Sequence, residues 1–129
     1  MIRTGVMVSS ALAFFALSHA AIAQDWDCTN AGDLPQQGMN FCAAKDFEKA
    51  DAALNVAWSL IRKDAIKASD GSDPLLAGQR AWLEYRDQQC DAESLIFEGG
   101  SLQPLIISSC RARMTRDRTE ELLLMERYN

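Results

Sequence analysis

Five polar residues have types and spacings that suit chemistry or binding. Asp51 and Asn55 lie four residues apart, and Gln79 and Arg86 lie seven apart, so each pair shares one face of a helix. Arg118 lies in the C-terminal part of the chain. In an active site, Asp51 would act as an acid or base beside one of the two arginines. We favour the alternative, a structural polar network that sets the register of packed helices.

The first 23 residues predict a signal peptide. Arg3 supplies a positive charge, residues 6–17 are apolar apart from two serines, and small residues lead to Ala-Ile-Ala before Gln24. An uncleaved anchor is the weaker alternative, because the apolar run is short for a bilayer span of about 20 residues. Cleavage leaves residues 24–129 as one domain without a membrane span, and we expect that domain to be periplasmic or secreted.

Removal of the signal peptide changes the composition that matters for function. Arg3 and the only histidine, His19, are lost, and the remaining 106 residues carry 18 acidic against 12 basic side chains, a net charge of −6. Without histidine there is no Ser-His-Asp or Cys-His arrangement and no imidazole ligand for zinc. The acidity argues against a nucleic-acid partner, since phosphate binding requires a basic face. The composition therefore gives little support to an enzyme, and we expect no catalytic residue, metal or cofactor.

The four cysteines, Cys28, Cys42, Cys90 and Cys110, all follow the predicted signal peptide and indicate two disulfides in an oxidising compartment. Three pairings are possible. We favour Cys28–Cys42 with Cys90–Cys110, because each of these pairs flanks a turn-rich segment. Each bond would stabilise the fold by about 3 kcal/mol. A thiolate metal cluster is the weaker alternative, because no two cysteines form a C-x-x-C pair.

Apolar residues at helical spacing predict three long helices and no strand. Residues 24–38 are polar and turn-rich, and they predict an irregular arm held by Cys28. Asn40 is a candidate cap for the first helix, and Asp73 followed by Pro74 is a candidate start for the second. The fold class is therefore all-α, a three-helix antiparallel bundle with an irregular N-terminal arm, stapled by two disulfides. The expected helices run from about 40 to 67, from 74 to 97, and from 102 or 104 to about 127.

Two loops between the expected helices are candidates for contact with a partner. One carries the carboxylates of Asp70 and Asp73, and the other runs from Glu98 through two glycines to Ser101. A net charge of −6 would steer a basic partner toward the chain.

Short motifs spread along residues 24–129 form a specific combination. They are Met-Asn-Phe-Cys at 39–42, Ala-Asp-Ala-Ala-Leu-Asn at 50–55, Gln-Arg-Ala-Trp-Leu-Glu-Tyr-Arg-Asp-Gln-Gln-Cys at 79–90, Gly-Gly-Ser at 99–101, Cys110 and Arg-Thr-Glu-Glu-Leu at 118–122. The combination resembles the lysozyme inhibitor LprI N-terminal-like family of small exported bacterial proteins.

The resemblance implies a helical, disulfide-bearing domain over residues 24–129, in the periplasm or outside the cell. From the family name it further implies inhibition of lysozyme by protein–protein contact. The alternative is a structural or stress-related module of the cell envelope with a different protein partner. The polar motif residues, Asp51 and Arg86 among them, resemble determinants of the fold rather than a lysozyme-contact surface.

Overall fold

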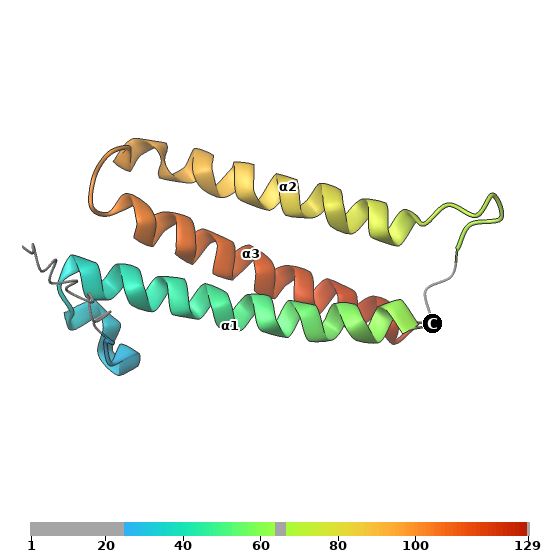
Figure 1. Ribbon diagram of the computed structural model, residues 1–129, viewed down its shortest axis with the longest axis horizontal. Coiled ribbons are helices and arrows are strands. Elements are labelled where there is room, and N and C mark those ends of the chain that lie inside the picture. The colour runs from blue at the N-terminus through green and yellow to red at the C-terminus, as the bar shows by residue number, and fades with distance from the viewer. Residues whose placement is uncertain (1–24, 64–66, 129) are drawn as a thin grey trace, which may run out of the picture.

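The computed structural model describes residues 25–63 and 67–128, and the predicted signal peptide, residues 1–23, lies outside them. Figure 1 shows three long helices in which consecutive helices run in opposite directions, so that α1 and α3 point the same way. Within the described residues there is no strand. The predicted all-α class and its three long helices are confirmed. The elements are η1 (Cys28–Asp33), α1 (Gln36–Lys63), α2 (Pro74–Ser94), η2 (Leu95–Phe97) and α3 (Gln103–Glu126).

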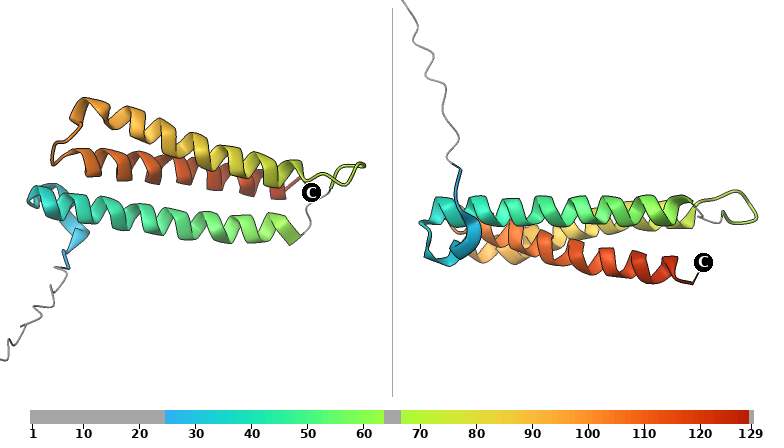
Figure 2. Two further views of the ribbon diagram at one scale, coloured as in Figure 1. Left: turned by 45° about the horizontal axis from the view of Figure 1, so that its top comes forward. Right: turned by 90° about the horizontal axis from the view of Figure 1, so that it is seen from below.

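The most extensive contact in the bundle joins α1 to α3, and a smaller one joins α2 to α3. Ala43, Ala50 and Ala57 recur every seven residues on one side of α1, and all three are buried. Because the distance between packed helices depends on the side chains at the contact, these small residues let α3 approach closely. Figure 2 shows from two further sides that the three helices lie along one another and that η1 sits where α1 begins.

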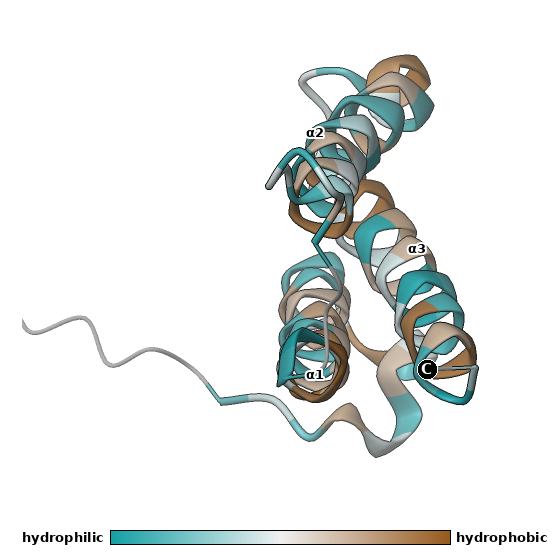
Figure 3. Cartoon of the chain, turned by 90° about the vertical axis from the view of Figure 1, so that its right-hand side faces the viewer, coloured by the Kyte–Doolittle hydropathy of each residue, from teal (hydrophilic) through white to brown (hydrophobic). Residues whose placement is uncertain are grey.

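The apolar core lies toward the end of the bundle where α1 ends. Leu54, Ala57 and Ile61 follow helical spacing on α1 and pack against Leu122 of α3. Four partly buried residues surround them: Trp58, Leu75, Trp82 and Leu123. Seen along the helices, polar segments occur on all three of them (Figure 3). None of the helices in residues 25–63 and 67–128 combines the length and the apolar character that a membrane crossing requires.

Both disulfides have the pairing that the sequence favours. Cys28–Cys42 joins η1 to α1, and Cys90–Cys110 joins the last turns of α2 to the first turns of α3, with a Cα–Cα distance of 5.5 Å in each case. The Met114 sulfur lies 3.7 Å from the Cys90 sulfur and 3.9 Å from the Cys110 sulfur. The second disulfide therefore forms part of a buried sulfur cluster between α2 and α3.

The first helix begins earlier than the sequence predicts. α1 starts at Gln36, so Asn40 is not its cap, and η1 makes much of the expected arm helical rather than irregular. The Asn40 side chain has other partners: its Oδ1 accepts a hydrogen bond from Gln36 Nε2 at 2.8 Å, and its Nδ2 donates to the Ser101 carbonyl at 3.0 Å. The expected end near Lys67 falls next to residues 64–66, which lie outside the described residues; α1 is described to Lys63, and Lys67 is not helical.

The second and third helices start as expected. Asp73 accepts a hydrogen bond from the Leu76 N–H at 2.9 Å and Pro74 stands at the first position of α2. This arrangement satisfies one of the free N–H groups that every helix start presents. The α-helix ends at Ser94 rather than at Phe97, because the chain tightens into the 3₁₀ turn η2 before the two glycines.

Candidate functional site

Arg86 lies where all three long helices meet. Only 7% of the residue is exposed. Its guanidinium donates to Thr115 Oγ1 on α3 at 3.3 Å and to Asp87 Oδ1 at 3.0 Å, and it lies 3.7 Å from Asp51 Oδ1 on α1. It also lies 5.1 Å from the centre of the Phe47 ring on α1. One side chain of α2 thus contacts both other helices.

Trp82 lies between Arg86 and a second arginine, Arg118 of α3. Its ring centre lies 5.3 Å from the Arg86 guanidinium and 5.9 Å from that of Arg118, so the ring is in cation–π distance of both. Arg118 Nε donates to Gln79 Oε1 at 3.0 Å, which joins α3 to α2. Its Nη1 donates to Glu121 Oε2 on its own helix at 2.8 Å. Two arginines therefore connect the helices through one indole ring.

The structure brings all five sequence-selected polar residues into this region. Asn55 reaches it through its Nδ2, which donates to Asp51 Oδ2 at 3.2 Å. Sequence analysis missed Phe47, because its contact with Arg86 depends on how α1 and α2 pack. Thr115 stands three residues before Arg118 on α3, so the two share one helix face. The contact between Trp82 and Arg86 could be predicted from the sequence, because the two residues are four apart and share one helix face. We name the whole group the central polar cluster: Phe47, Asp51, Asn55, Gln79, Trp82, Arg86, Thr115 and Arg118.

The central polar cluster has the geometry of packed side chains rather than of an open active site. Arg86 and Thr115, which join α2 to α3, are buried. Guanidinium groups stay protonated and act only as donors, so neither arginine can serve as a base. Within the described residues, no three metal-ligating side chains gather at one point. The hydrogen bonds of the cluster join α2 to α3, and the Arg86–Asp51 ion pair joins α2 to α1.

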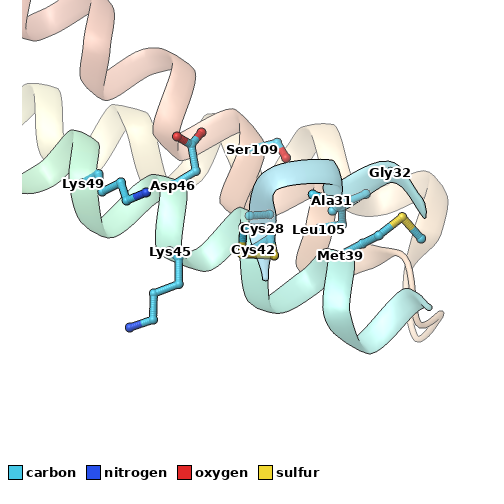
Figure 4. A pocket seen from close by; sticks show the side chains of 11 residues that line it. Cys28, Ala31, Gly32, Met39, Cys42, Lys45, Asp46, Lys49, Leu105 and Ser109 are labelled. Carbon is cyan, nitrogen blue, oxygen red and sulfur yellow. A yellow bond between two sulfur atoms is a disulfide. The ribbon is translucent and has the colours of Figure 1, made fainter. Parts of the chain in front are cut away.

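A groove of about 470 Å³ lies beside the N-terminal arm, between α1 and α3. Figure 4 shows the Cys28–Cys42 disulfide and Met39 on its walls, with the charged side chains of α1 at one side. Two of those charges have partners: Lys45 donates to Glu48 at 2.7 Å, and Asp46 accepts from Arg116 of α3 at 3.0 Å. Lys49 takes part in none of the ion pairs of the described residues. The Glu48 carboxylate raises the pKa of Lys45. The groove therefore offers sulfur and small side chains but no converging reactive groups.

The two candidate contact loops lie at opposite ends of the bundle (Figure 1). α2 separates them with 21 residues, about 30 Å at 1.5 Å per residue. Asp73 caps α2 and also accepts from Arg62 at 2.6 Å, and Asp70 accepts from the Ser72 N–H at 2.9 Å. These hydrogen bonds hold the pKa of each carboxyl below its ordinary value. Both carboxylates of this loop are thus engaged within the loop and its neighbouring helix.

The other loop follows η2 and is fixed to the body of the protein. Gly99 has a φ of 72°, a conformation that favours glycine, and its N–H donates to Gln103 Oε1 at 3.0 Å. The Ser101 carbonyl accepts from Asn40 of α1. Glu98 is exposed, and it takes part in none of the ion pairs of the described residues. Of the candidate loops, this one keeps its carboxylate available.

Comparison with known proteins places this arrangement in a family. A family model described as lysozyme inhibitor LprI matches residues 28–122, from the first cysteine to the buried leucine of α3. An uncharacterized protein of Rhizobium meliloti strain 1021 is 39% identical over 108 residues, which cover 74% of this chain and 76% of that protein. The uncharacterized protein YecT of Escherichia coli K12 is 26% identical over 121 residues, covering 81% of this chain and 73% of YecT. No solved structure matches the chain.

Proposed function

Because the chain belongs to the lysozyme inhibitor LprI family, we propose that it is an exported protein that binds and inhibits lysozyme by protein–protein contact. The family match over residues 28–122 is the observation that carries the proposal. Both disulfides support a periplasmic or secreted location, since such bonds persist in oxidising compartments. In this proposal the signal peptide, residues 1–23, is removed during export, and the folded domain acts by binding through its surface.

Charge supports lysozyme as the partner. Many lysozymes are strongly basic, and residues 24–129 carry a net charge of −6. Opposite net charges raise the rate at which two proteins meet, and local complementarity then selects the orientation. Inhibition needs no catalytic group, which agrees with a central polar cluster whose arginines are used in packing.

The test is a cell-wall lysis assay with a basic c-type lysozyme. The inhibitor is produced from the full chain, exported, and purified in its oxidised form. We expect the rate of lysis to fall as the protein is added and to reach a constant minimum once the enzyme is saturated. The effect will weaken as salt rises but will persist at ionic strengths above about 0.15 M, where the Debye length is shorter than about 8 Å, because a specific contact outlasts pure charge attraction.

An unrelated acidic protein of similar size and net charge serves as the control. It should slow lysis only at low ionic strength. The proposal fails if a large excess of the purified protein leaves lysis unchanged at low salt. In that case the alternative, a cell-envelope module with another protein partner, becomes the better description, and co-purification from a periplasmic extract would identify that partner.

A further inference from the structure

The acidic charge of the protein is concentrated at one end of the bundle. Residues 25–44 and 87–110 contain seven Asp and Glu residues and no Lys, Arg or His. These two ranges form the N-terminal arm, the first turns of α1, the last turns of α2, η2 and the first turns of α3. Figure 1 shows all of these segments at the same end. The rest of residues 24–129 is nearly neutral, with 11 acidic and 12 basic side chains. We name this region the acidic end.

Part of this charge is compensated by α3, and part is not. Asp87, Asp91 and Glu93 of α2 pair with arginines of α3 that lie just past the acidic end. Asp33 and Glu98 are exposed, and the ion pairs of the described residues include neither of them. The carboxylates of Asp33 and Glu98 are therefore available to a partner.

Two large aliphatic side chains project from the same end. Leu95 is 59% exposed and Ile96 is 83% exposed, and both belong to the three-residue turn η2. Single exposed aliphatic residues are common on protein surfaces. Two adjacent ones at the extremity of a bundle, next to the carboxylate of Glu98, have the composition of an interface centre with a polar rim. We name residues 95–101 the tip.

The tip is held in place by the structure beneath it. The Glu98 N–H donates to the Leu95 carbonyl at 3.1 Å, and the Gly100 N–H donates to the Phe97 carbonyl at 2.9 Å. The hydrogen bonds of Gly99 and Ser101 described above fix it to α3 and α1. The Cys90–Cys110 disulfide joins the two helices that the tip connects. A surface fixed in this way loses little conformational entropy on binding.

We propose that the tip is the surface that contacts lysozyme. Leu95 and Ile96 become buried in the interface, and Glu98 pairs with a basic side chain at the rim of the enzyme's cleft. The inference rests on the proposed function, because it takes a basic lysozyme as the occupant. Charge complementarity selects that occupant, since the exposed Asp33 and Glu98 at this end take part in none of the ion pairs of the described residues. The opposite loop is the poorer candidate, because Asp70 and Asp73 are engaged and Arg62 lies beside them.

The test compares variants of the exported, oxidised protein for lysozyme affinity and for inhibition of lysis. Leu95→Ser combined with Ile96→Ser should weaken binding about 30-fold, the scale of losing interface anchors. Val56→Ser is the matched control, because Val56 is 63% exposed on α1 and lies outside the acidic end. It should change affinity less than two-fold. Thermal unfolding should be unchanged in both proteins, since the altered side chains are exposed.

A third variant tests the charge. Glu98→Gln should slow association at low salt and match the unaltered protein at high salt, because screening removes the charge contribution. If the unaltered protein inhibits lysozyme and the Leu95, Ile96 double variant inhibits equally well, the tip is not the contact surface and the proposed function stands. If the unaltered protein does not bind lysozyme, both proposals fall.

Discussion

Replacing Arg86 by Ala tests whether the central polar cluster holds the bundle together. The change removes hydrogen bonds to Thr115 and Asp87, the approach to Asp51, and the contacts with two aromatic rings. The two aspartates are only half-buried, so water replaces their lost partner. Thr115 is completely buried and loses a donor to its hydroxyl oxygen.

The expected loss of stability follows from these contacts. A buried group left without its partner costs about 1–3 kcal/mol, and each lost cation–π contact costs about 0.5–1 kcal/mol. Because the contacts share one side chain, the terms are not additive, and we expect a loss of about 3 kcal/mol. For a domain of this size that corresponds to a fall in Tm of about 15 °C.

Urea unfolding followed by circular dichroism measures the loss directly. Arg80→Ala is the matched control, because Arg80 is exposed on the same helix, and it should stay within about 0.5 kcal/mol of the unaltered protein. Arg86→Met should recover part of the loss, since its side chain fills the space of the arginine stem. A loss below about 1 kcal/mol for Arg86→Ala would refute a structural role for the cluster.

Three further predictions concern the backbone, the disulfide and the helix cap. Gly38→Ala should destabilise the fold, because an added Cβ would lie 2.9 Å from atoms of the N-terminal arm, whereas Gly78→Ala has open space and should stabilise α2 by about 0.5–1 kcal/mol; equal effects in urea unfolding would contradict this. Replacing Cys90 and Cys110 by Ala should lower the free energy of unfolding by about 3 kcal/mol, measured against the unaltered oxidised protein, and no loss would show that the closed loop adds nothing. Asp73→Ala should flatten the pH dependence of Tm in acid. Hydrogen bonds from Leu76 and Arg62 hold the pKa of Asp73 below its ordinary value of 3.8 in the folded protein. The stabilisation from the Asp73 carboxylate is therefore complete above pH 3.8 and is lost as the pH falls through the lower pKa of the folded state. If Asp73→Ala leaves the dependence of Tm on pH unaltered, the cap does not contribute in this way.

The parts of the fold that the sequence predicted are those specified by neighbours in the chain. Asp73 and Pro74 start α2 because a cap and a first-position proline act within one turn. The start of α1 depended on a distant contact instead. Asn40 has the side chain of a good cap, but it hydrogen-bonds the carbonyl of Ser101, which lies 61 residues away. No local pattern reveals such a partner, so the sequence did not predict that α1 begins at Gln36.

The same distinction applies to the polar residues. Asp51 and Asn55 were paired correctly because residues four apart on a helix are neighbours. The sequence placed Gln79 and Arg118 on suitable faces but did not show that they bond to each other, since that depends on how α2 and α3 pack. The acidic end is a similar case. Its two base-free ranges are visible in the sequence, yet only the antiparallel path of the chain brings residues 25–44 beside residues 87–110.

The buried residues that join α2 to the other helices and the residues of the proposed binding surface lie at different positions along the chain. Gln79 and Arg86 are buried in its first and middle turns and join it to the other helices. Leu95 and Ile96 follow its last turn and face solvent. A family that keeps its polar core and disulfides can therefore vary the tip without loss of stability, because exposed residues contribute little to the free energy of unfolding. Affinity for lysozyme and resistance to unfolding should accordingly respond to different substitutions in this protein.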